Sequence, residues 1–342
     1  MNSLSKKIVF ATFLATVSLA CADVNEDLDS IANTKLSSAT VDPEGRSCAS
    51  MDALRDQLID NPGLIRKMEE IERQTSKFIA DRGGEITAAA TLTDAQTIEI
   101  PVVVNVIYNT AQENISDAQI ASQIAVLNND FRATNSDVSG LNNTVFSGTA
   151  ADFNIHYTLF AVNRKASTKT SWGTRDAMKS SKKGGIDPTD PTRKLNIWVC
   201  NIGGGILGYA QFPGGSSATD GVVIGPNYFG SSSLGSGFYL SAPYDKGRTA
   251  THEIGHWLNL RHIWGDATCG SDLVSDTPTH NTANYGCPTY PHLSTCTGTP
   301  VEMTMNYMDY TDDPCMYMFT NGQKVRARAI FATGGARATF VP

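Results

Sequence analysis

The sequence has little positive charge and no long hydrophobic stretch beyond its N-terminus. Its 27 Lys and Arg residues are outnumbered by 34 Asp and Glu residues, and the formal net charge is −7. Nucleic-acid binding depends on clustered basic side chains that neutralise phosphates, so we expect no nucleic-acid partner. The apolar run Ile8–Ala20 is too short to anchor the chain across a bilayer, and no other segment is apolar enough over the required length. We therefore expect no transmembrane segment.

Several common catalytic and cofactor motifs are also missing. The sequence contains no Walker phosphate-binding motif, no GxSxG nucleophile motif and no CxxC pair. Gly203–Gly208 does satisfy GxGxxG after an apolar run, but Tyr209–Gly215, which follows it, cannot be the helix that a dinucleotide site requires. We expect this segment to be a loop that leads to an edge strand, which leaves nucleotide binding without support.

The N-terminus has the pattern of an export signal. Two lysines precede the apolar run Ile8–Ala20, and small residues follow it. Cleavage before Asp23 would release a soluble secreted protein. Cleavage before Cys21 would instead give a lipid-anchored N-terminus, although Ser18 stands where bacterial lipoproteins usually carry Leu. We take residues 1–20 as a signal peptide and expect a secreted, extracellular protein.

Three of the six histidines fall within one run of eleven residues, His252-Glu253-Ile254-Gly255-His256-Trp257-Leu258-Asn259-Leu260-Arg261-His262. On a helix, His252 and His256 lie one turn apart on the same face, so both rings can reach one metal ion. His262 must come from beyond the helix end. Three nitrogen ligands leave a fourth tetrahedral position open, which is typical of a catalytic rather than a structural zinc site. Glu253 is then placed to act on water at the metal.

One residue departs from the extended zinc motif HExxHxxGxxH. Asn259 stands where that motif has glycine, at the point where the chain must leave the helix and turn toward the third histidine. Such turns use a left-handed backbone conformation, and Asn tolerates it better than most other residues. A bare HExxH also occurs by chance on surface helices, but the third histidine makes chance a poor explanation. We therefore interpret Asn259 as a permissible substitute.

The seven cysteines fall into separate groups. Four of them follow the histidine motif in a stretch rich in Gly, Pro, Thr and Asn: Cys269, Cys287, Cys296 and Cys315. In an exported protein they indicate two disulfides, and the sequence alone does not choose among the three pairings. Cys200 ends an apolar run and is expected to be a small buried hydrophobe on a strand. Cys48 stands alone near the N-terminus.

Apolar periodicity separates a helical N-terminal part from a mixed remainder. Met51–Arg82 has helical spacing broken at Asn61-Pro62-Gly63, and Gly83–Thr97 has the small, polar composition of a linker. Beyond it, strands are predicted at Pro101–Tyr108, Phe153–Phe160, Lys194–Asn201 and Asp220–Ile224. Helices are predicted at Ser116–Phe131 with Ser116 as N-cap, from near Thr249, and at Thr320–Phe331 with a capping-box start.

Further sequence blocks follow the histidine motif, namely Asp276-Thr277-Pro278, Tyr285-Gly286-Cys287-Pro288 and Asn306-Tyr307-Met308-Asp309-Tyr310-Thr311-Asp312-Asp313. A methionine after a three-histidine zinc motif is the Met-turn signature. From Pro101 to Phe331 the chain resembles the pappalysin family of metzincin metallopeptidases, in particular its small microbial, ulilysin-like members. The resemblance implies an α+β catalytic domain with a mixed, mostly parallel twisted sheet, an active-site helix and a loop-rich, disulfide-stapled C-terminal subdomain.

The resemblance also implies a division of the chain and roles for its residues. Residues 1–20 would be the signal peptide, 21–97 a helical pro-region with a linker, and 98–342 the catalytic domain. His252, His256 and His262 would bind Zn²⁺, with Glu253 as general base and later general acid. Met308 would lie beneath the metal, and Tyr310 would stabilise the tetrahedral intermediate.

Asp313 is the residue that the resemblance implies for specificity. It would lie in the pocket for the residue just after the cleaved bond, so the protease would prefer cleavage on the N-terminal side of Arg or Lys.

The same resemblance implies disulfides Cys269–Cys296 and Cys287–Cys315. It also implies structural calcium (Ca²⁺) bound by Asp272, Ser275, Thr277 and Cys287, the second and the last through their backbone carbonyl oxygens.

Cys48 lies in a stretch that resembles the cysteine switch of ulilysin-like zymogens, although Ala49 stands where that stretch usually has Gly. Its thiolate would fill the open position at the zinc until the pro-region is removed by cleavage within Lys77–Thr97. Self-cleavage before Arg82 would match the expected specificity.

The alternative reading is a catalytically inactive binding or adhesion module on the same fold, for which Asn259 is the only support. For the protease, the expected partners are protein or peptide substrates carrying Arg or Lys, and the protein is expected to be a monomer.

Overall fold

The computed structural model describes residues 45–81 and 96–341. The predicted signal peptide, the alternative lipid site at Cys21 and nearly all of the predicted linker lie outside these residues. None of the helices in the described ranges is long and apolar enough to cross a membrane.

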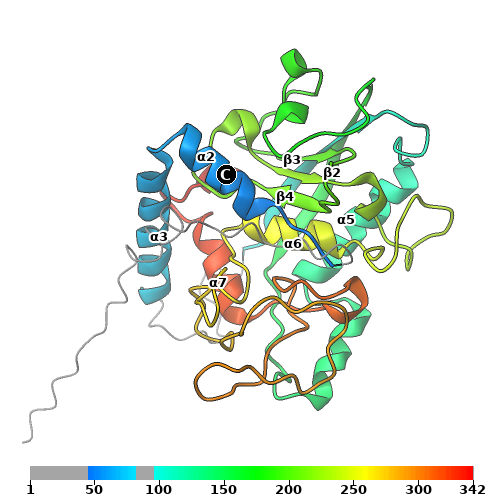
Figure 1. Ribbon diagram of the computed structural model, residues 1–342. Coiled ribbons are helices and arrows are strands. Elements are labelled where there is room, and N and C mark those ends of the chain that lie inside the picture. The colour runs from blue at the N-terminus through cyan, green and yellow to red at the C-terminus, as the bar shows by residue number, and fades with distance from the viewer. Residues whose placement is uncertain (1–44, 82–95, 342) are drawn as a thin grey trace, which may run out of the picture.

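A single five-stranded sheet organises the larger part of the chain (Figure 1). Its strands stand in the order β2-β1-β3-β5-β4, and every neighbouring pair is parallel except β5 and β4. This is the mixed, mostly parallel sheet that the sequence predicted. The strand bounds are β1 (Ile98–Tyr108), β2 (Ile155–Ala166), β3 (Leu195–Val199), β4 (Gly208–Ala210) and β5 (Val222–Ile224).

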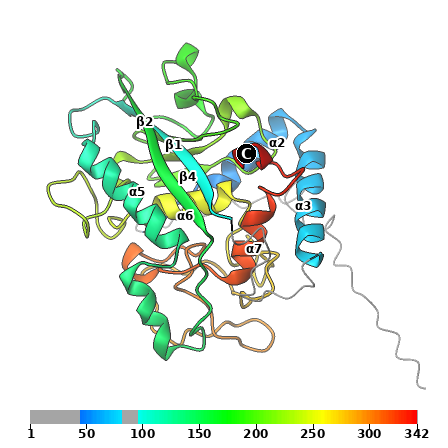
Figure 2. The same cartoon turned by 180° about the vertical axis from the view of Figure 1, so that it is seen from behind.

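Both faces of the sheet are covered, as the near-continuous apolar composition of its central strands requires. Along β3, Ile197 and Val199 pack into the main core, while Trp198 packs on the opposite face with Trp172 and Met178. Helices α5 (Asp117–Phe131) and α6 (Arg248–Trp257) cover the first of these faces and lie side by side in Figures 1 and 2. The sheet therefore provides a rigid support for α6.

The helix ends follow the local sequence signals. The Ser116 side chain accepts a hydrogen bond from the Gln119 backbone N–H and so caps α5. Helix α7 (Asn321–Ala329) begins with the full capping box formed by Thr320 and Gln323. The predictions for both helix starts are confirmed.

The strands differ in extent from the sequence prediction. β2 continues to Ala166, well beyond the predicted end at Phe160, and most residues of its second half are only half-buried. The sequence pattern misses this part because the strand is held there by pairing with β1 rather than by burial of its side chains. β4 is the edge strand expected after the glycine-rich loop, and Cys200 is fully buried just after β3.

The N-terminal segment, residues 45–81, packs against the sheet-containing part. It forms α2 (Ser50–Asp60) and α3 (Leu64–Ala80), which are separated at the predicted Asn61-Pro62-Gly63 break. Leu54 and Leu64 form a small apolar cluster with Phe212, and α3 lies beside α7 in both views (Figures 1 and 2). Just before α2 the chain pairs with the edge strand, since Ala49 N–H donates to Gly208 O and Leu207 N–H donates to Ser47 O.

Between α6 and α7 the chain is loop-rich and is joined by two disulfides. They are Cys269–Cys296 and Cys287–Cys315, with Cα–Cα distances of 5.7 and 5.5 Å. Both pairings implied by the family resemblance are therefore confirmed. In a segment with so little regular structure, these crosslinks restrict the unfolded chain and so favour the folded state.

Candidate metal centre

Helix α6 carries two histidines toward one point and then ends abruptly. All ten residues of α6 are buried. Its last turn closes through hydrogen bonds from Leu258 N–H to Ile254 O and from Leu260 N–H to Gly255 O. Between them Asn259 adopts φ 71°, the left-handed conformation that the motif's glycine usually supplies. The interpretation of Asn259 as a tolerated substitute is confirmed.

The Nδ1 atom of each of the three histidines lies within hydrogen-bond distance of an oxygen atom. The Nδ1 atoms of His252 and His256 lie 2.7 and 2.9 Å from the backbone oxygens of Tyr307 and Leu260, and Nδ1 of His262 lies 2.5 Å from Asp266 Oδ1. Backbone carbonyls and an ionised carboxylate accept but do not donate hydrogen bonds, so each Nδ1 must carry the proton. In the neutral form of each ring, Nε2 is therefore the unprotonated nitrogen.

These three lone pairs face one another at short range. His256 Nε2 lies 3.2 Å from His252 Nε2 and 3.1 Å from His262 Nε2. Between neutral rings no proton bridges these nitrogens, and a cation placed among them would bind all three lone pairs. Two ligands on a tetrahedral zinc at about 2.0–2.1 Å would lie about 3.3 Å apart, so the donor set fits zinc.

Electrostatics keep two of the rings neutral. Burial, and after it the neighbouring histidines, lower the pKa of His252 and His256 well below the usual range. Neutral imidazole is the form that binds a metal ion. Cys48 Sγ completes the group: together with one nitrogen from each histidine it forms a set of four potential ligands within 4.8 Å of one another.

Glu253 lies in the same site, and its carboxylate accepts hydrogen bonds from the N-terminal segment. Its Oε2 accepts hydrogen bonds from Ser50 Oγ at 2.7 Å and from Cys48 Sγ at 3.3 Å. Burial raises the pKa of Glu253 to about 7, against the opposing effect of these hydrogen bonds. The same burial, and then the Glu253 charge, raise the pKa of the Cys48 thiol well above its usual value.

Met308 packs directly beneath the histidine helix. A Cβ atom at Gly255 would come within 2.4 Å of Met308 Sδ, so only glycine fits there. Tyr307, the preceding residue, accepts the His252 hydrogen bond through its backbone oxygen. The Met308 segment thus sets the orientation of a metal-directed ring, which is a direct structural reason for a Met-turn at this position.

Tyr310 borders the site on the side of the third histidine. Its ring centroid lies 4.9 Å from that of His262 and 4.7 Å from that of Trp264, which itself stacks on His262 at 4.4 Å. The Tyr310 hydroxyl donates to the Cys48 backbone oxygen at 3.4 Å. The hydroxyl therefore points toward an acceptor carbonyl next to the histidine cluster.

Asp313 forms the base of a fully buried polar pocket. Its Oδ2 accepts hydrogen bonds from the backbone N–H groups of Lys246 and Arg248, at the start of α6, at 2.8 and 3.2 Å. Its Oδ1 lies 2.5 Å from Arg46 Nη2 in an ion pair that is almost completely buried. The positive end of the helix and an arginine thus both stabilise the Asp313 carboxylate.

The Arg46 guanidinium fills this pocket with each of its three nitrogens satisfied. Besides its contact with Asp313, Nε donates to Thr311 O at 3.1 Å and Nη1 donates to Thr249 Oγ1 at 3.2 Å. The guanidinium carbon also lies 5.0 Å from the ring centroid of Tyr244, in cation–π range. The pocket therefore has the shape and charge to hold an arginine side chain.

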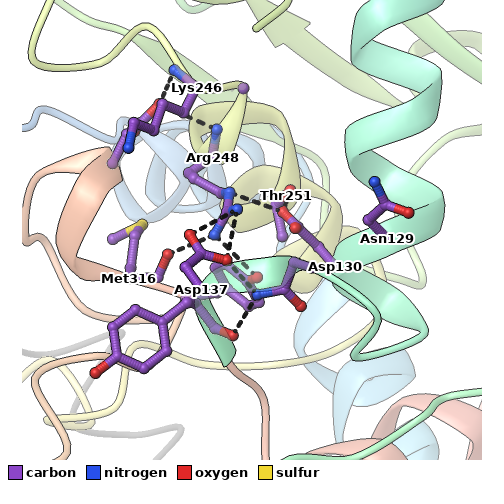
Figure 3. A network of polar contacts seen from close by, with 12 residues as sticks. Asn129, Asp130, Asp137, Lys246, Arg248, Thr251 and Met316 are labelled. Atoms are coloured by element: carbon purple, nitrogen blue, oxygen red, sulfur yellow. Dashed lines mark hydrogen bonds and ion pairs between the residues drawn. The ribbon is translucent and has the colours of Figure 1, made fainter. Parts of the chain in front are cut away.

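Arg248 fixes the start of the histidine helix to three other segments (Figure 3). Its side chain points between Asp130 at the end of α5 and Asp137, at 3.2 and 3.1 Å, and donates to Met316 O at 2.6 Å. Thr251 Oγ1, one turn along α6, also donates to Asp130. This network fixes the position of α6 and of the backbone groups that hold Asp313.

The residues predicted to bind calcium are only partly brought together by the contacts seen. Thr277 Oγ1 lies 2.9 and 3.0 Å from the two carboxylate oxygens of Asp272, which also accepts from the Val274 N–H. The side chain of Cys287 forms the disulfide with Cys315, and the predicted ligand is its backbone oxygen. Burial raises the pKa of Asp272 to about 6. Ser275 lies in the same turn, between Asp272 and Thr277.

Three contributors to the site were missed in the sequence analysis. Asp266 orients His262 from four residues further along, and the acidic residue just after the third histidine was a usable signal. Arg46 and Ser50 flank Cys48 and contact Asp313 and Glu253, respectively. Nothing in their local sequence indicates those distant partners.

The fold and the site together define a zinc metalloprotease of the metzincin type. A mostly parallel sheet supports a helix with two metal-directed histidines, a third histidine follows a left-handed turn, and a methionine lies beneath them. Residues 187–332 match the Peptidase_M43 family model, described as pregnancy-associated plasma protein-A. The chain belongs to this family, the pappalysins.

Individual relatives agree with this assignment. The chain is 33% identical over 244 residues to extracellular metalloprotease 1 of Coccidioides posadasii, covering 68% of this chain and 77% of that protein. It is 34% identical over 242 residues to an extracellular metalloprotease of Verticillium alfalfae, covering 68% and 78%. These proteins carry the same activity in their names, and the alignments include most of each.

Solved structures of a bacterial relative are similar as well. Mature mirolysin of Tannerella forsythia, in complex with a cleaved peptide, is 44% identical with a TM-score of 0.68, covering 72% of this chain and 96% of that one. A mutant of promirolysin from the same organism is 39% identical with a TM-score of 0.75, and it covers 86% and 97%. The match therefore extends over more of this chain when the precursor form is compared.

Proposed function

We propose that the protein is a secreted zinc endopeptidase, made as a latent zymogen, that cleaves on the N-terminal side of arginine or lysine. In this reading residues 1–20 are the signal peptide, 21–97 the pro-region with its linker, and 98–342 the catalytic domain. The observation that carries the proposal is the convergence of the Nε2 atoms of three histidines beside Glu253, with Cys48 among them. The relatives named extracellular metalloproteases support an extracellular location, and we propose the secreted form rather than a lipid anchor at Cys21.

His252, His256 and His262 would hold the zinc ion, which when bound acidifies water and polarises the scissile carbonyl. The residues of the chain then supply proton transfer and orientation. Glu253 Oε2 takes a proton from the attacking water and delivers it to the leaving amine. The Tyr310 hydroxyl donates a hydrogen bond to the oxyanion, and Asp266 keeps the His262 ring in place.

Latency follows from what the N-terminal segment contacts. Cys48 Sγ is within reach of the three nitrogens and would be the fourth zinc ligand, at the position that water needs. Ser50 at the same time binds the Glu253 carboxylate, so the general base is also engaged. Ala49, in place of the usual glycine, is buried and pairs through its N–H with Gly208, so its methyl group is accommodated.

Substrate preference is supported by the pocket that Arg46 fills. A guanidinium there has three separate acceptors and an aromatic ring, whereas a lysine ammonium would satisfy fewer of them. We therefore expect arginine to be preferred over lysine just after the cleaved bond, with Asp313 as the residue that determines this preference.

We also propose that calcium binds at Asp272, Ser275, Thr277 and Cys287. Burial raises the pKa of the Asp272 carboxylate, and a cation would stabilise its charged form.

An inactive binding module on the same fold is a weaker proposal. It would require a defect in the catalytic set, and the geometry of His262, Glu253 and Tyr310 offers none. Asn259, its only support in the sequence, adopts the backbone conformation that the site needs. We further propose that the protein acts as a monomer.

The direct test is to digest a denatured protein with the activated enzyme and to sequence the released peptides. We expect most new N-termini to begin with Arg, a smaller number to begin with Lys, and the digestion to stop when a chelator removes the zinc and to resume when zinc is added back. A zinc-loaded enzyme that released no peptides would contradict the proposal of a protease. Peptides without basic N-termini would contradict only the proposed specificity.

The cysteine switch has its own test in the uncleaved precursor. Replacing Cys48 with Ala is expected to raise hydrolysis of a short Arg-containing peptide by about tenfold or more, because the open zinc position is no longer filled by sulfur. Mass spectrometry must show that the chain is still uncut. Cys200→Ala, at a buried cysteine on the far side of the sheet, is the matched control and should remain latent. A Cys48→Ala precursor as inert as this control would reject the switch.

A further inference from the structure

A second charged contact joins the N-terminal segment to the catalytic part, away from the histidine site. Glu72 on α3 makes a two-pronged ion pair with Arg326 on α7, with both oxygen–nitrogen distances at 2.6 Å. Both residues are buried. Arg326 Nε also donates to Asn259 O at 2.8 Å, so the same guanidinium holds the turn between His256 and His262.

The charge state of Glu72 depends on its contact with Arg326. Burial alone would raise the pKa of Glu72, but Arg326, together with Arg261 and Asn259, outweighs that effect and lowers the pKa. If α3 leaves, Arg326 keeps its contact with Asn259 and loses the Glu72 carboxylate. Separating a buried, bidentate ion pair leaves a buried charge without its partner, so we expect α3 to dissociate slowly.

Other contacts of the segment are likewise independent of the chain that follows it. Leu54 and Leu64 enclose Phe212, and Gln74 donates to Thr333 O at 3.4 Å. Together with Arg46 and Glu72, they hold residues 45–81 to the rest of the protein at both ends. None of them depends on an intact connection through residues 82–95.

We propose that the surface formed by Arg326 and Asn259 is a docking site for helix α3 through its buried Glu72, and that this contact keeps the cleaved N-terminal segment bound as a non-covalent inhibitor. This proposal rests on the proposed zymogen function and adds a step to it. Cutting the chain between 81 and 96 leaves the protease inhibited, and dissociation of α3 from α7 determines when activity begins. Glu72 sets the rate of that dissociation.

The test uses the full-length chain carrying Glu253→Ala, so that it cannot cut itself, with a recognition sequence for a site-specific protease placed within residues 84–93. After cleavage in zinc-containing buffer, the fragment with α2 and α3 is expected to co-elute with the catalytic part on gel filtration. Glu72→Gln should increase its dissociation rate by about 30-fold or more, the size of effect found when a buried charge pair loses one partner. Glu72→Asp, which keeps the charge, should fall in between.

Glu70→Gln is the matched control, because Glu70 lies on the same helix but forms an exposed ion pair with Arg73. It should leave the dissociation rate unchanged. Immediate separation of the unsubstituted fragments would overturn the proposal, as would equal dissociation rates for Glu72→Gln and Glu70→Gln. Co-elution does not require hydrolysis, so either result would leave the proposed protease function standing. Conversely, an inactive enzyme whose fragments co-elute would contradict only that function.

Discussion

Replacing Glu253 with Gln is expected to lower the kcat/KM of the activated protein by a factor on the order of 10²–10⁴, the usual contribution of a general base. Glutamine keeps the size and hydrogen-bonding capacity of the side chain but cannot accept the proton of the attacking water. The three histidines keep their own partners, Tyr307 O, Leu260 O and Asp266, so the variant should still bind zinc. The measurements are hydrolysis of a short Arg-containing peptide and zinc content.

Glu99→Gln is a suitable control for this variant, since Glu99 is an exposed residue that pairs with His156 on the sheet edge. Its kcat/KM should match that of the unsubstituted enzyme. If Glu253→Gln retained more than a tenth of the activity with zinc bound, the proton would have to be taken by another group. Loss of zinc from the variant would instead show that Glu253 acts through the metal site.

Replacing Asp313 with Asn is expected to lower kcat/KM for a peptide with Arg just after the cleaved bond by about 30-fold or more, as for other buried charge pairs that lose one partner. Asn retains an oxygen that can accept from the Lys246 and Arg248 N–H groups, so the start of α6 should keep its geometry. A peptide with Ala at the same position should lose little. The ratio of the two kcat/KM values therefore reports specificity separately from any general loss.

Asp312→Asn is the matched control for this experiment, since it changes the adjacent carboxylate, a hydrogen-bond partner of Tyr244, and leaves Asp313 in place. It should retain the preference for Arg. An Asp313→Asn enzyme that still favoured Arg by the same ratio would show that the pocket reads its substrate through Thr249, Thr311 and Tyr244 alone.

Much of the metal centre could be predicted because its determinants are local. The spacing of His252 and His256 fixes one helix face, and Asn259 is compatible with the turn that brings His262 back. The capping box of α7 is equally local. Such signals depend on residues within one or two turns, and the structure retains all of them.

The remaining features depend on contacts between distant residues and left no local signal. Arg46 lies 267 positions from Asp313, and no periodicity or motif connects them. The second half of β2 is only half-buried and forms a strand through pairing with β1. Glu72 and Arg326 are each ordinary helix residues in sequence, and only the packing of α3 on α7 makes them a buried pair.

The pairing of Ser47 and Ala49 with the strand at Gly208 also bears on the behaviour of the precursor before it meets any substrate. An open strand at the border of a sheet presents unpaired N–H and C=O groups that recruit extended segments of other chains and so favour aggregation. In the precursor these groups are already taken by the protein's own chain. Under the proposed zymogen function, the segment would protect this sheet edge from association with other chains, and the edge would open to extended peptides when the segment departs.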